Sequence, residues 1–219
     1  VFSLSFTGKK RRNSICSTIE VQITDSVKDQ FVTDQRIKDY IHSSDIKVLG
    51  EPVKNINTKK LERYLDERNN IKKSEVYFTA NGDLHVRVNQ RNPIVRIVNK
   101  KGQSYYIDQE GAIIPLSGSY SSHVLVATGE ISEFFKVPRT ERIHCGDKSK
   151  DHTNHSICEI YELARFIHQD SFWNSQIEQI YLNQQGEYEL IPRVGAHLIQ
   201  LGEFANYKEK FRNLKAFYR

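Results

Sequence analysis

The strongest constraint on the fold is an Asn81-Gly82 pair that lies between two runs of strand-forming residues. The runs are Val76–Thr79 and Leu84–Val88, and the second alternates apolar and polar residues, as a strand with one buried face does. Asn and Gly both tolerate the positive φ that the two central positions of a type I′ turn require. The sequence therefore predicts a β-hairpin closed by a type I′ turn.

The residues before this hairpin predict one strand and two helices. Ile19–Ile23 alternates apolar and polar residues and is typical of a strand. A first helix is expected behind Thr33 or Asp34, either of which can cap it, and a second behind Asn57, because these residue types cap helix N-termini. Ile56 and Leu61 are spaced as a hydrophobic staple around the second cap. The order β-α-α-β-β predicts a three-stranded sheet with two helices on one face, a layout that resembles a POTRA module.

Beyond Gln90–Pro93, which we take as a domain boundary, the chain becomes rich in strands. Helices are expected around Ile157–Ile167, closed by Asp170-Ser171, and over Tyr207–Tyr218, while residues 133–155 are polar and irregular. The predicted strands are Ile94–Val98, Ser104–Ile107, Ala112–Ile114, Val124–Thr128, Ile177–Leu182, Tyr188–Ile191 and His197–Leu201.

The fold class expected from this pattern is α+β, with a POTRA-like β-α-α-β-β module followed by a mixed, β-rich domain with two helices. We expect a juxtamembrane tail over residues 1–17, a POTRA-like domain over 18–91 and a β domain over 92–219.

The net charge of +5 is concentrated in one place, since Lys9–Arg12 carries four positive charges and the rest is close to neutral. A basic groove for nucleic acid is therefore not expected, because the basic run lies in a terminal tail without aromatic residues. Such a run attracts anionic lipid headgroups. Val1–Phe6 is too short to span a bilayer and is either the last turn of a membrane anchor that lies upstream or a disordered end.

The cysteines and histidines are the candidates for redox and metal chemistry. Cys145 and Cys158 could form one disulfide in an oxidising compartment, but an odd and sparse set of three cysteines favours free thiols. A zinc site would draw on His144, Cys145, His152, His155 and Cys158. Their spacing fits no established zinc motif, so neither a metal nor a cofactor is expected.

Nucleophilic catalysis is not expected either. Ser122-His123 and His144-Cys145 are neighbours in sequence only, and no nucleophile elbow, dinucleotide fingerprint or P-loop occurs. We therefore expect a protein that is not an enzyme. A metal- or ligand-dependent enzyme around His152–Cys158 stays as a third possibility.

Several short segments, taken in order, resemble the FtsQ/DivIB family of bacterial division proteins, in its Bacteroidetes form. They are Gln90–Arg96, Tyr105–Asp108 with Gly111 and Pro115–Ser117, Asp170–Trp173 with Gln176–Ile180, Pro192–Gly195, and Leu201-Gly202 followed by the helix Tyr207–Arg219. The resemblance implies a single-pass inner-membrane protein with this region in the periplasm. It implies a non-enzymatic scaffold that recruits FtsB and FtsL, contacts septal peptidoglycan synthases, and helps regulate septal peptidoglycan synthesis.

The resemblance also suggests where a partner binds. In the family a last strand follows the C-terminal helix, whereas this sequence ends at Arg219, so we expect a truncated strand and an exposed edge at the strand before that helix. An open edge invites strand addition. The expected partner-binding residues are His197, Leu198, Ile199, Gln200, Leu201, Tyr207 and Phe211.

The alternative function is a POTRA-containing component of outer-membrane protein assembly or secretion. Residues 94–201 lack the sustained amphipathic strand series of a membrane barrel, which disfavours that alternative.

Overall fold

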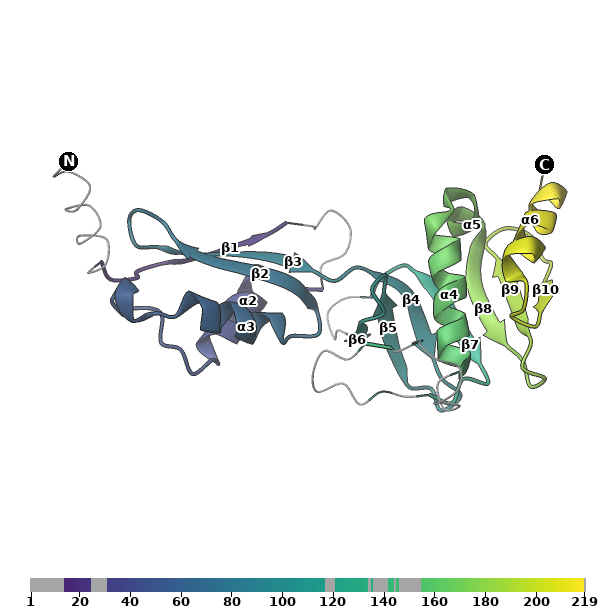
Figure 1. Cartoon of the computed structure of the whole chain (residues 1–219), viewed down its shortest axis with the longest axis horizontal. Coiled ribbons are helices and arrows are strands. Elements are labelled where there is room, and N and C mark those ends of the chain that lie inside the picture. The colour runs from purple at the N-terminus through teal and green to yellow at the C-terminus, as the bar shows by residue number, and fades with distance from the viewer. Residues whose placement is uncertain are drawn as a thin grey trace. The chain divides into compact units, whose positions relative to one another are not determined.

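The computed structural model describes residues 14–24, 31–116, 121–133, 135, 142–143, 145 and 155–218. The chain divides into two compact units, Val1–Arg91 and Asn92–Arg219, and Figure 1 colours them from purple to yellow along the sequence.

The first unit is a three-stranded sheet with two helices on one face (Figure 1). The strand order is β1-β3-β2, with β1 parallel and β2 antiparallel to the central β3. The predicted β-α-α-β-β order is confirmed. Its elements are β1 (Ile19–Ile23), α2 (Asp34–His42), the short 3₁₀ helix η1 (Val53–Asn55), α3 (Thr58–Asp66), β2 (Ile71–Phe78) and β3 (Leu84–Gln90).

Both helices of this unit begin where their capping residues predict. The Thr33 hydroxyl accepts a hydrogen bond from the backbone N–H of Arg36 at 3.2 Å. The Asn57 carboxamide accepts one from the N–H of Lys60 at 3.0 Å. Each bond satisfies a backbone donor that the first turn of a helix leaves without a partner.

The hairpin between β2 and β3 is present, but the prediction of a type I′ turn was wrong. Gly82 has a φ of 94°, whereas Asn81 stays out of the left-handed region, where the only described residue other than glycine is Asn206. The N–H of Gly82 donates to the Thr79 carbonyl, and the N–H of Thr79 donates to the Asp83 carbonyl. This is a three-residue loop in which a turn is followed by a left-handed glycine, so only one residue needs positive φ.

The second unit is built on one seven-stranded mixed sheet, with strand order β10-β9-β8-β7-β4-β5-β6. Residues far apart in sequence form its centre, because β7 pairs in parallel with both β4 and β8. Helix α4 packs against the sheet (Figure 1). The strands are β4 (Pro93–Val98), β5 (Ser104–Asp108), β6 (Ile113–Pro115), β7 (Leu125–Gly129), β8 (Ile177–Leu182), β9 (Tyr188–Pro192) and β10 (Ile199–Gly202), and the helices are α4 (His155–Gln169), α5 (Ser171–Gln176) and α6 (Tyr207–Phe217).

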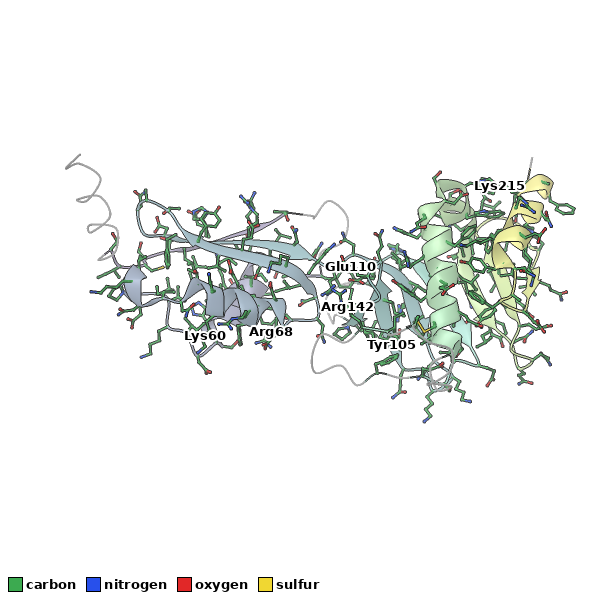
Figure 2. All side chains as sticks on the ribbon, in the orientation of Figure 1. Lys60, Arg68, Tyr105, Glu110, Arg142 and Lys215 are labelled. Carbon is green, nitrogen blue, oxygen red and sulfur yellow. A yellow bond between two sulfur atoms is a disulfide. The ribbon has the colours of Figure 1, made fainter. Side chains whose placement is uncertain are left out.

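Helix α4 ends at Gln169, as the predicted stop at Asp170-Ser171 requires, but the short helix α5 that follows was not predicted. Asp170 begins α5, because its carboxylate accepts hydrogen bonds from the N–H groups of Phe172 and Trp173 at 2.9 and 3.3 Å. The ammonium of Lys215, labelled in Figure 2, donates to the other carboxylate oxygen at 2.9 Å. This bond, aided by the two backbone donors, lowers the pKa of Asp170 below its ordinary value. Asp170 therefore links α5 to α6.

Close packing of β7 against β8 depends on Gly129. This residue has a φ of 107°, and a Cβ added there would lie 2.0 Å from the carbonyl oxygen of Leu182 in β8. Only glycine fits, because it has no Cβ and tolerates positive φ.

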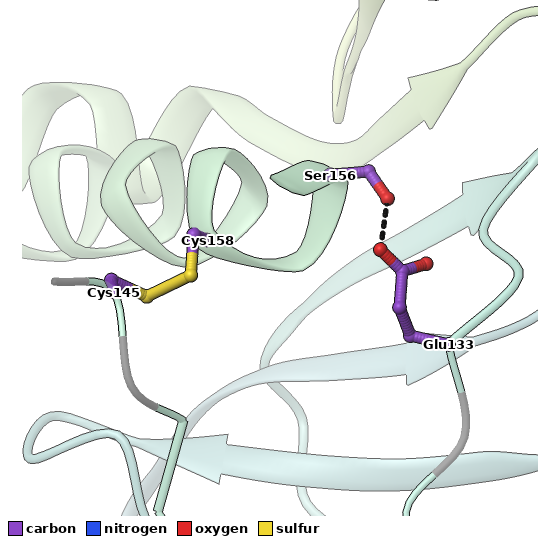
Figure 3. The surroundings of a disulfide bond; sticks show 4 residues. All are labelled: Glu133, Cys145, Ser156 and Cys158. Carbon is purple, nitrogen blue, oxygen red and sulfur yellow. Dashed lines mark hydrogen bonds between the residues drawn. A yellow bond between two sulfur atoms is a disulfide. The ribbon is translucent and has the colours of Figure 1, made fainter. Parts of the chain in front are cut away.

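Cys145 and Cys158 form a disulfide, so the expectation of free thiols was wrong for this pair. Figure 3 shows the bond joining Cys145 to the first turns of α4, where the hydroxyl of Ser156 also donates a hydrogen bond to Glu133. An odd number of cysteines does not exclude a bridge, because Cys16 stays buried as a free thiol in the other unit. The pairing removes Cys145 and Cys158 from any zinc site.

Candidate functional site

The strand in which most of the expected partner-binding residues were placed, β10, is the terminal strand of the seven-stranded sheet. It pairs with β9 on one side, and no strand of the described chain lies on its other side. The strand begins at Ile199 rather than at His197, so His197 and Leu198 belong to the approach to β10 and not to the strand.

The seven expected residues differ in how accessible they are to a partner. His197, Leu198 and Gln200 are exposed, and Ile199 and Tyr207 are half-buried. Leu201 and Phe211 are buried in the core, where they hold β10 and α6 against the sheet and are not accessible to a partner.

The aromatic residues of α6 fasten it to the rest of this unit. Tyr207 packs edge-on against Phe166 of α4, with ring centroids 5.5 Å apart, and stacks on Phe204 at 4.8 Å. Burial raises the pKa of Tyr207, which keeps its hydroxyl protonated. The hydroxyl of Tyr218 lies 3.1 Å from Nε2 of His197, a hydrogen bond that ties the end of α6 to the approach to β10.

Two exposed apolar residues near β10 were not among the partner-binding residues expected from the sequence. Val194 is 75% exposed in the β9–β10 turn, and Phe217 is 88% exposed at the end of α6. Leu198, which is 49% exposed, lies next to the hydrogen-bonded His197, as Phe217 lies next to Tyr218. A signal was available, since Phe217 falls outside the apolar stripe that Tyr207, Phe211, Leu214 and Tyr218 form on α6.

The opposite edge of the same sheet, at β6, is partly covered. Residues Ala112 and Arg142 form an isolated antiparallel bridge, and the N–H of Ile143 donates to the Gly111 carbonyl at 2.9 Å. Glu110 and Arg142, both labelled in Figure 2, form an ion pair at 3.2 Å. Cys145 lies two residues after Ile143, and its disulfide with Cys158 joins this part of the chain to α4.

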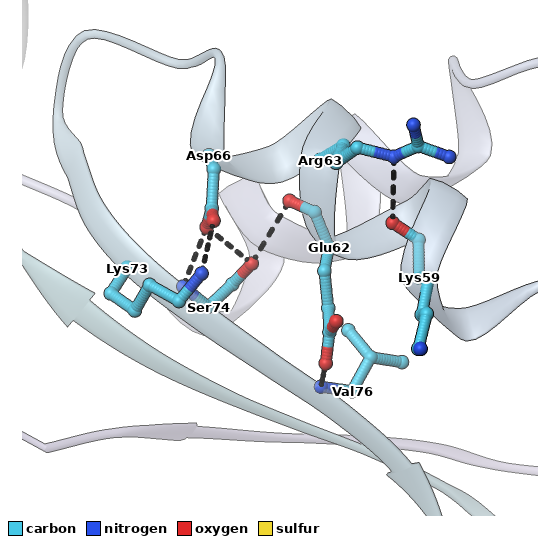
Figure 4. Close-up of polar contacts among 7 residues, drawn as sticks. All are labelled: Lys59, Glu62, Arg63, Asp66, Lys73, Ser74 and Val76. Atoms are coloured by element: carbon cyan, nitrogen blue, oxygen red, sulfur yellow. Dashed lines mark hydrogen bonds and ion pairs between the residues drawn. The ribbon is translucent and has the colours of Figure 1, made fainter.

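The β2 edge in the first unit is covered by side chains of α3 (Figure 4). The carboxylate of Glu62 accepts from the N–H of Val76 at 2.8 Å, and that of Asp66 accepts from the N–H of Ser74 at 2.6 Å. Asp66 also accepts from the Ser74 hydroxyl and from the ammonium of Lys73. Because these backbone donors already have acceptors, strand addition at this part of β2 would have to displace two carboxylates.

The sequence-derived candidates for metal binding and catalysis are not brought together in the described residues. No three His, Cys, Asp or Glu side chains among them could hold a metal ion together. The Cys145 thiol of the His144-Cys145 pair is consumed by its disulfide, and Ser122 is a buried residue whose N–H donates to the hydroxyl of Tyr106. His144, His152 and the side chain of His155 lie outside the described residues, as does the basic run Lys9–Arg12.

None of the helices in the described residues combines the length and the apolar character that crossing a bilayer requires.

Two family models match the chain and divide it as the structure does. Residues 14–89 match a model described as a POTRA-like domain, and residues 92–219 match one described as FtsQ/DivIB, C-terminal related. No curated protein matches the chain. Domains of these two kinds are generally scaffolds without catalytic activity. Because the second match covers more than half of the chain, the protein belongs to the FtsQ/DivIB-related family, with a POTRA-like domain ahead of its FtsQ/DivIB-like region.

Proposed function

We propose that the protein is a non-catalytic scaffold of the bacterial division site whose β10 edge binds membrane proteins of the FtsB and FtsL kind. Through these partners it would help to regulate septal peptidoglycan synthesis, with septal peptidoglycan synthases as further contacts. The combination of a POTRA-like and an FtsQ/DivIB-related domain fits a division scaffold.

The open side of β10 is the observation that carries this proposal. A terminal strand presents backbone N–H and carbonyl groups that can pair with a partner strand. Of the terminal strands, β6 and β2 are partly covered, whereas β10 and β1 lack such a cover among the described residues. The β10 edge is favoured because it belongs to the FtsQ/DivIB-related unit.

Exposed apolar side chains beside β10 supply the second part of the argument. Backbone pairing alone does not select a partner, so specificity comes from side chains next to the added strand. Leu198 and Phe217 are the sequence neighbours of His197 and Tyr218, which are hydrogen-bonded to each other, and each offers apolar area that a partner would remove from water. Phenylalanine is one of the residue types enriched in protein interfaces.

The proposed location is the periplasm, with anchoring in the inner membrane. The Cys145–Cys158 disulfide supports an oxidising compartment, because disulfides are rare in the reducing cytosol.

The test is calorimetric titration of the chain with the periplasmic segments of the FtsB- and FtsL-like proteins of the same organism. Leu198→Asp and Phe217→Asp place a charge on the proposed surface and should each weaken binding at least tenfold, or about 1.4 kcal/mol. Leu116→Asp is the matched control, because Leu116 is 45% exposed and follows β6 at the opposite edge of the sheet. We expect its affinity to stay within about twofold of the parent chain, which is less than about 0.5 kcal/mol.

Two results would count against the proposal. Equal affinities for the Leu198→Asp, Phe217→Asp and Leu116→Asp variants would move the partner site away from β10. No binding by the parent chain would remove FtsB- and FtsL-like proteins as its direct partners.

A further inference from the structure

The helical face of the POTRA-like unit carries an arginine stacked on two tyrosine rings. The guanidinium of Arg68 lies over the ring of Tyr64 at 4.2 Å and over that of Tyr40 at 5.1 Å. Arg36 lies over the same Tyr40 ring at 5.2 Å, and its Nε donates to the Tyr40 hydroxyl. The hydroxyls of Tyr64 and Ser43 are hydrogen-bonded at 3.3 Å. Residues from α2, α3 and the turn after each of them therefore form one cluster, which we call the Tyr-Arg cluster.

Within the described chain, the Arg68 side chain has no hydrogen-bond or ion-pair partner. Its Nε is buried and donates to no described acceptor, and neither terminal nitrogen has a carboxylate or carbonyl partner there. Other arginines are paired with acids, as Arg87 is with Glu75 and Arg142 is with Glu110. A guanidinium that stacks on aromatic rings keeps its N–H groups in its own plane, where the terminal pair can bind a carboxylate with two parallel hydrogen bonds.

Two of the acids of α3, Glu62 and Asp66, lie on the side of the helix away from the Tyr-Arg cluster. Glu62 and Asp66 are one helical turn apart and both are committed to the backbone of β2 (Figure 4). Lys60 and Tyr64 are also one turn apart, and at about 100° per residue they lie roughly on the opposite side of the helix from that pair. Figure 2 labels Lys60 and Arg68 along this helix.

The remaining charges near the cluster leave it basic. Lys59 and Arg63 are exposed on α3, and Arg63 donates only to the backbone carbonyl of Lys59. On α2, Asp39 is close enough to Arg36 to interact with it and accepts a hydrogen bond from the side chain of Gln35 at 2.9 Å. Asp39 is thus engaged with Gln35 and Arg36. Glu67, the exposed residue directly before Arg68, takes part in an interaction of its own, and Arg68 forms no ion pair within the described residues.

We propose that the Tyr-Arg cluster is a docking site for an acidic peptide segment of a partner protein. A carboxylate of the partner would accept hydrogen bonds from the terminal nitrogens of Arg68, while Arg36 and Lys60 attract the neighbouring acidic residues. Tyr and Arg are the residue types most enriched at binding hot spots. A peptide is preferred to a lipid surface because Arg68 is half-buried with a buried Nε, so a protruding side chain reaches it more readily than a flat layer of headgroups.

The test measures the fluorescence anisotropy of a fluorescein-labelled peptide of six glutamates titrated with the full chain. All proteins carry serine in place of Lys9–Arg12, because that basic run would attract the polyanion by itself. Arg68→Gln should weaken binding tenfold or more, and Arg68→Lys threefold or more, since lysine keeps the charge but lacks the planar fork. Lys101→Gln, an equal loss of charge in the exposed β4–β5 turn, should change the affinity less than twofold.

A structural role for Arg68 gives a different result. If the stacked arginine only fastens α2 to α3, Arg68→Gln and Tyr64→Leu will lower the melting temperature but bind the peptide as the parent does when measured well below that temperature. That outcome would overturn the proposal, as would equal weakening by Arg68→Gln and Lys101→Gln or a parent chain that does not bind. Vesicles containing phosphatidylglycerol serve as the other arm, and Arg68-dependent binding to them without peptide binding would overturn the choice of occupant.

This site is independent of the β10 edge. The Leu198→Asp variant should bind the six-glutamate peptide with unchanged affinity. A negative result for the β10 edge would therefore not contradict the proposal for the Tyr-Arg cluster, and the reverse also holds.

Discussion

Replacing both Cys145 and Cys158 with serine is expected to lower the free energy of unfolding of the second unit by about 3 kcal/mol. The two cysteines are 13 residues apart in sequence. Closing a loop of that length removes about 10 cal/mol/K of entropy from the unfolded chain, which corresponds to about 3 kcal/mol at 25 °C. For a unit of this length the entropy of unfolding is about 270 cal/mol/K, so the melting temperature should fall by roughly 11 °C.

The assay is thermal unfolding followed by circular dichroism, with and without a reductant. Reduction of the parent chain should lower its melting temperature to that of the double-serine variant, and the variant itself should not respond to the reductant. This comparison separates the loss of the covalent bond from any effect of the serine side chains, because the reduced parent lacks the bond but keeps both cysteines.

A count of reactive thiols gives an independent check of the same bond. The unfolded and unreduced parent should expose one thiol, from Cys16, and the unfolded and reduced parent should expose three. The reasoning would be refuted by three thiols before reduction. It would equally be refuted by a melting temperature that reductant changes by less than about 2 °C, where the entropy argument requires a much larger shift.

Two further substitutions, Gly129→Ala with Gly186→Ala as its control and Asp170→Ala, test packing and capping in the same unit. Gly129→Ala should lower the free energy of unfolding, measured in urea, by more than about 4 kcal/mol, because a Cβ there overlaps the backbone of β8. Gly186 is also a left-handed glycine but has open space around it, so Gly186→Ala should lower the free energy of unfolding by only about 1–2 kcal/mol. Similar losses for both variants would contradict the argument from close approach. Asp170→Ala should cost about 1 kcal/mol at pH 7 through the lost helix cap. Since the hydrogen bond from Lys215 lowers the pKa of Asp170, the stabilisation by the charged carboxylate is present above the ordinary value of 3.8 and is lost as the pH falls through the lowered pKa. The difference between Asp170→Ala and the parent should therefore shrink in acid, and a difference that grows in acid would show that the sign is wrong.

Local signals predicted most of the secondary structure because they act within a few residues. Thr33 and Asn57 start their helices, since the bond each accepts comes from an N–H three residues later. At Asp170 the end of α4 was predicted correctly, but the same residue also caps a second helix, α5, and that helix was missed. Asn81-Gly82 correctly indicated a hairpin, but the pairing of β2 with β3 sets the loop length, and that pairing decided against a type I′ turn.

The candidate sites were less accessible to sequence reasoning, because they depend on which segments become neighbours. Leu201 and Phe211 have the apolar character expected of a partner surface and of a core alike, and only the packing of β10 and α6 places them in the core. Glu62 and Asp66 are spaced like ordinary surface charges on a helix, yet both reach backbone donors of β2. Arg68 gives no sign in the sequence that two tyrosines from different helices will stack on its side chain.

What the sequence by itself determined was the succession of strands and helices, since periodicity, caps and turn residues act over a few neighbouring residues. The tertiary structure alone decided which strand ends the sheet, which cysteines pair and which charges remain without a partner. These properties depend on contacts between residues that are distant in the chain, as in the parallel pairing of β7 with β4 and β8. Such contacts form when the whole unit buries its apolar surface, and no local pattern encodes them.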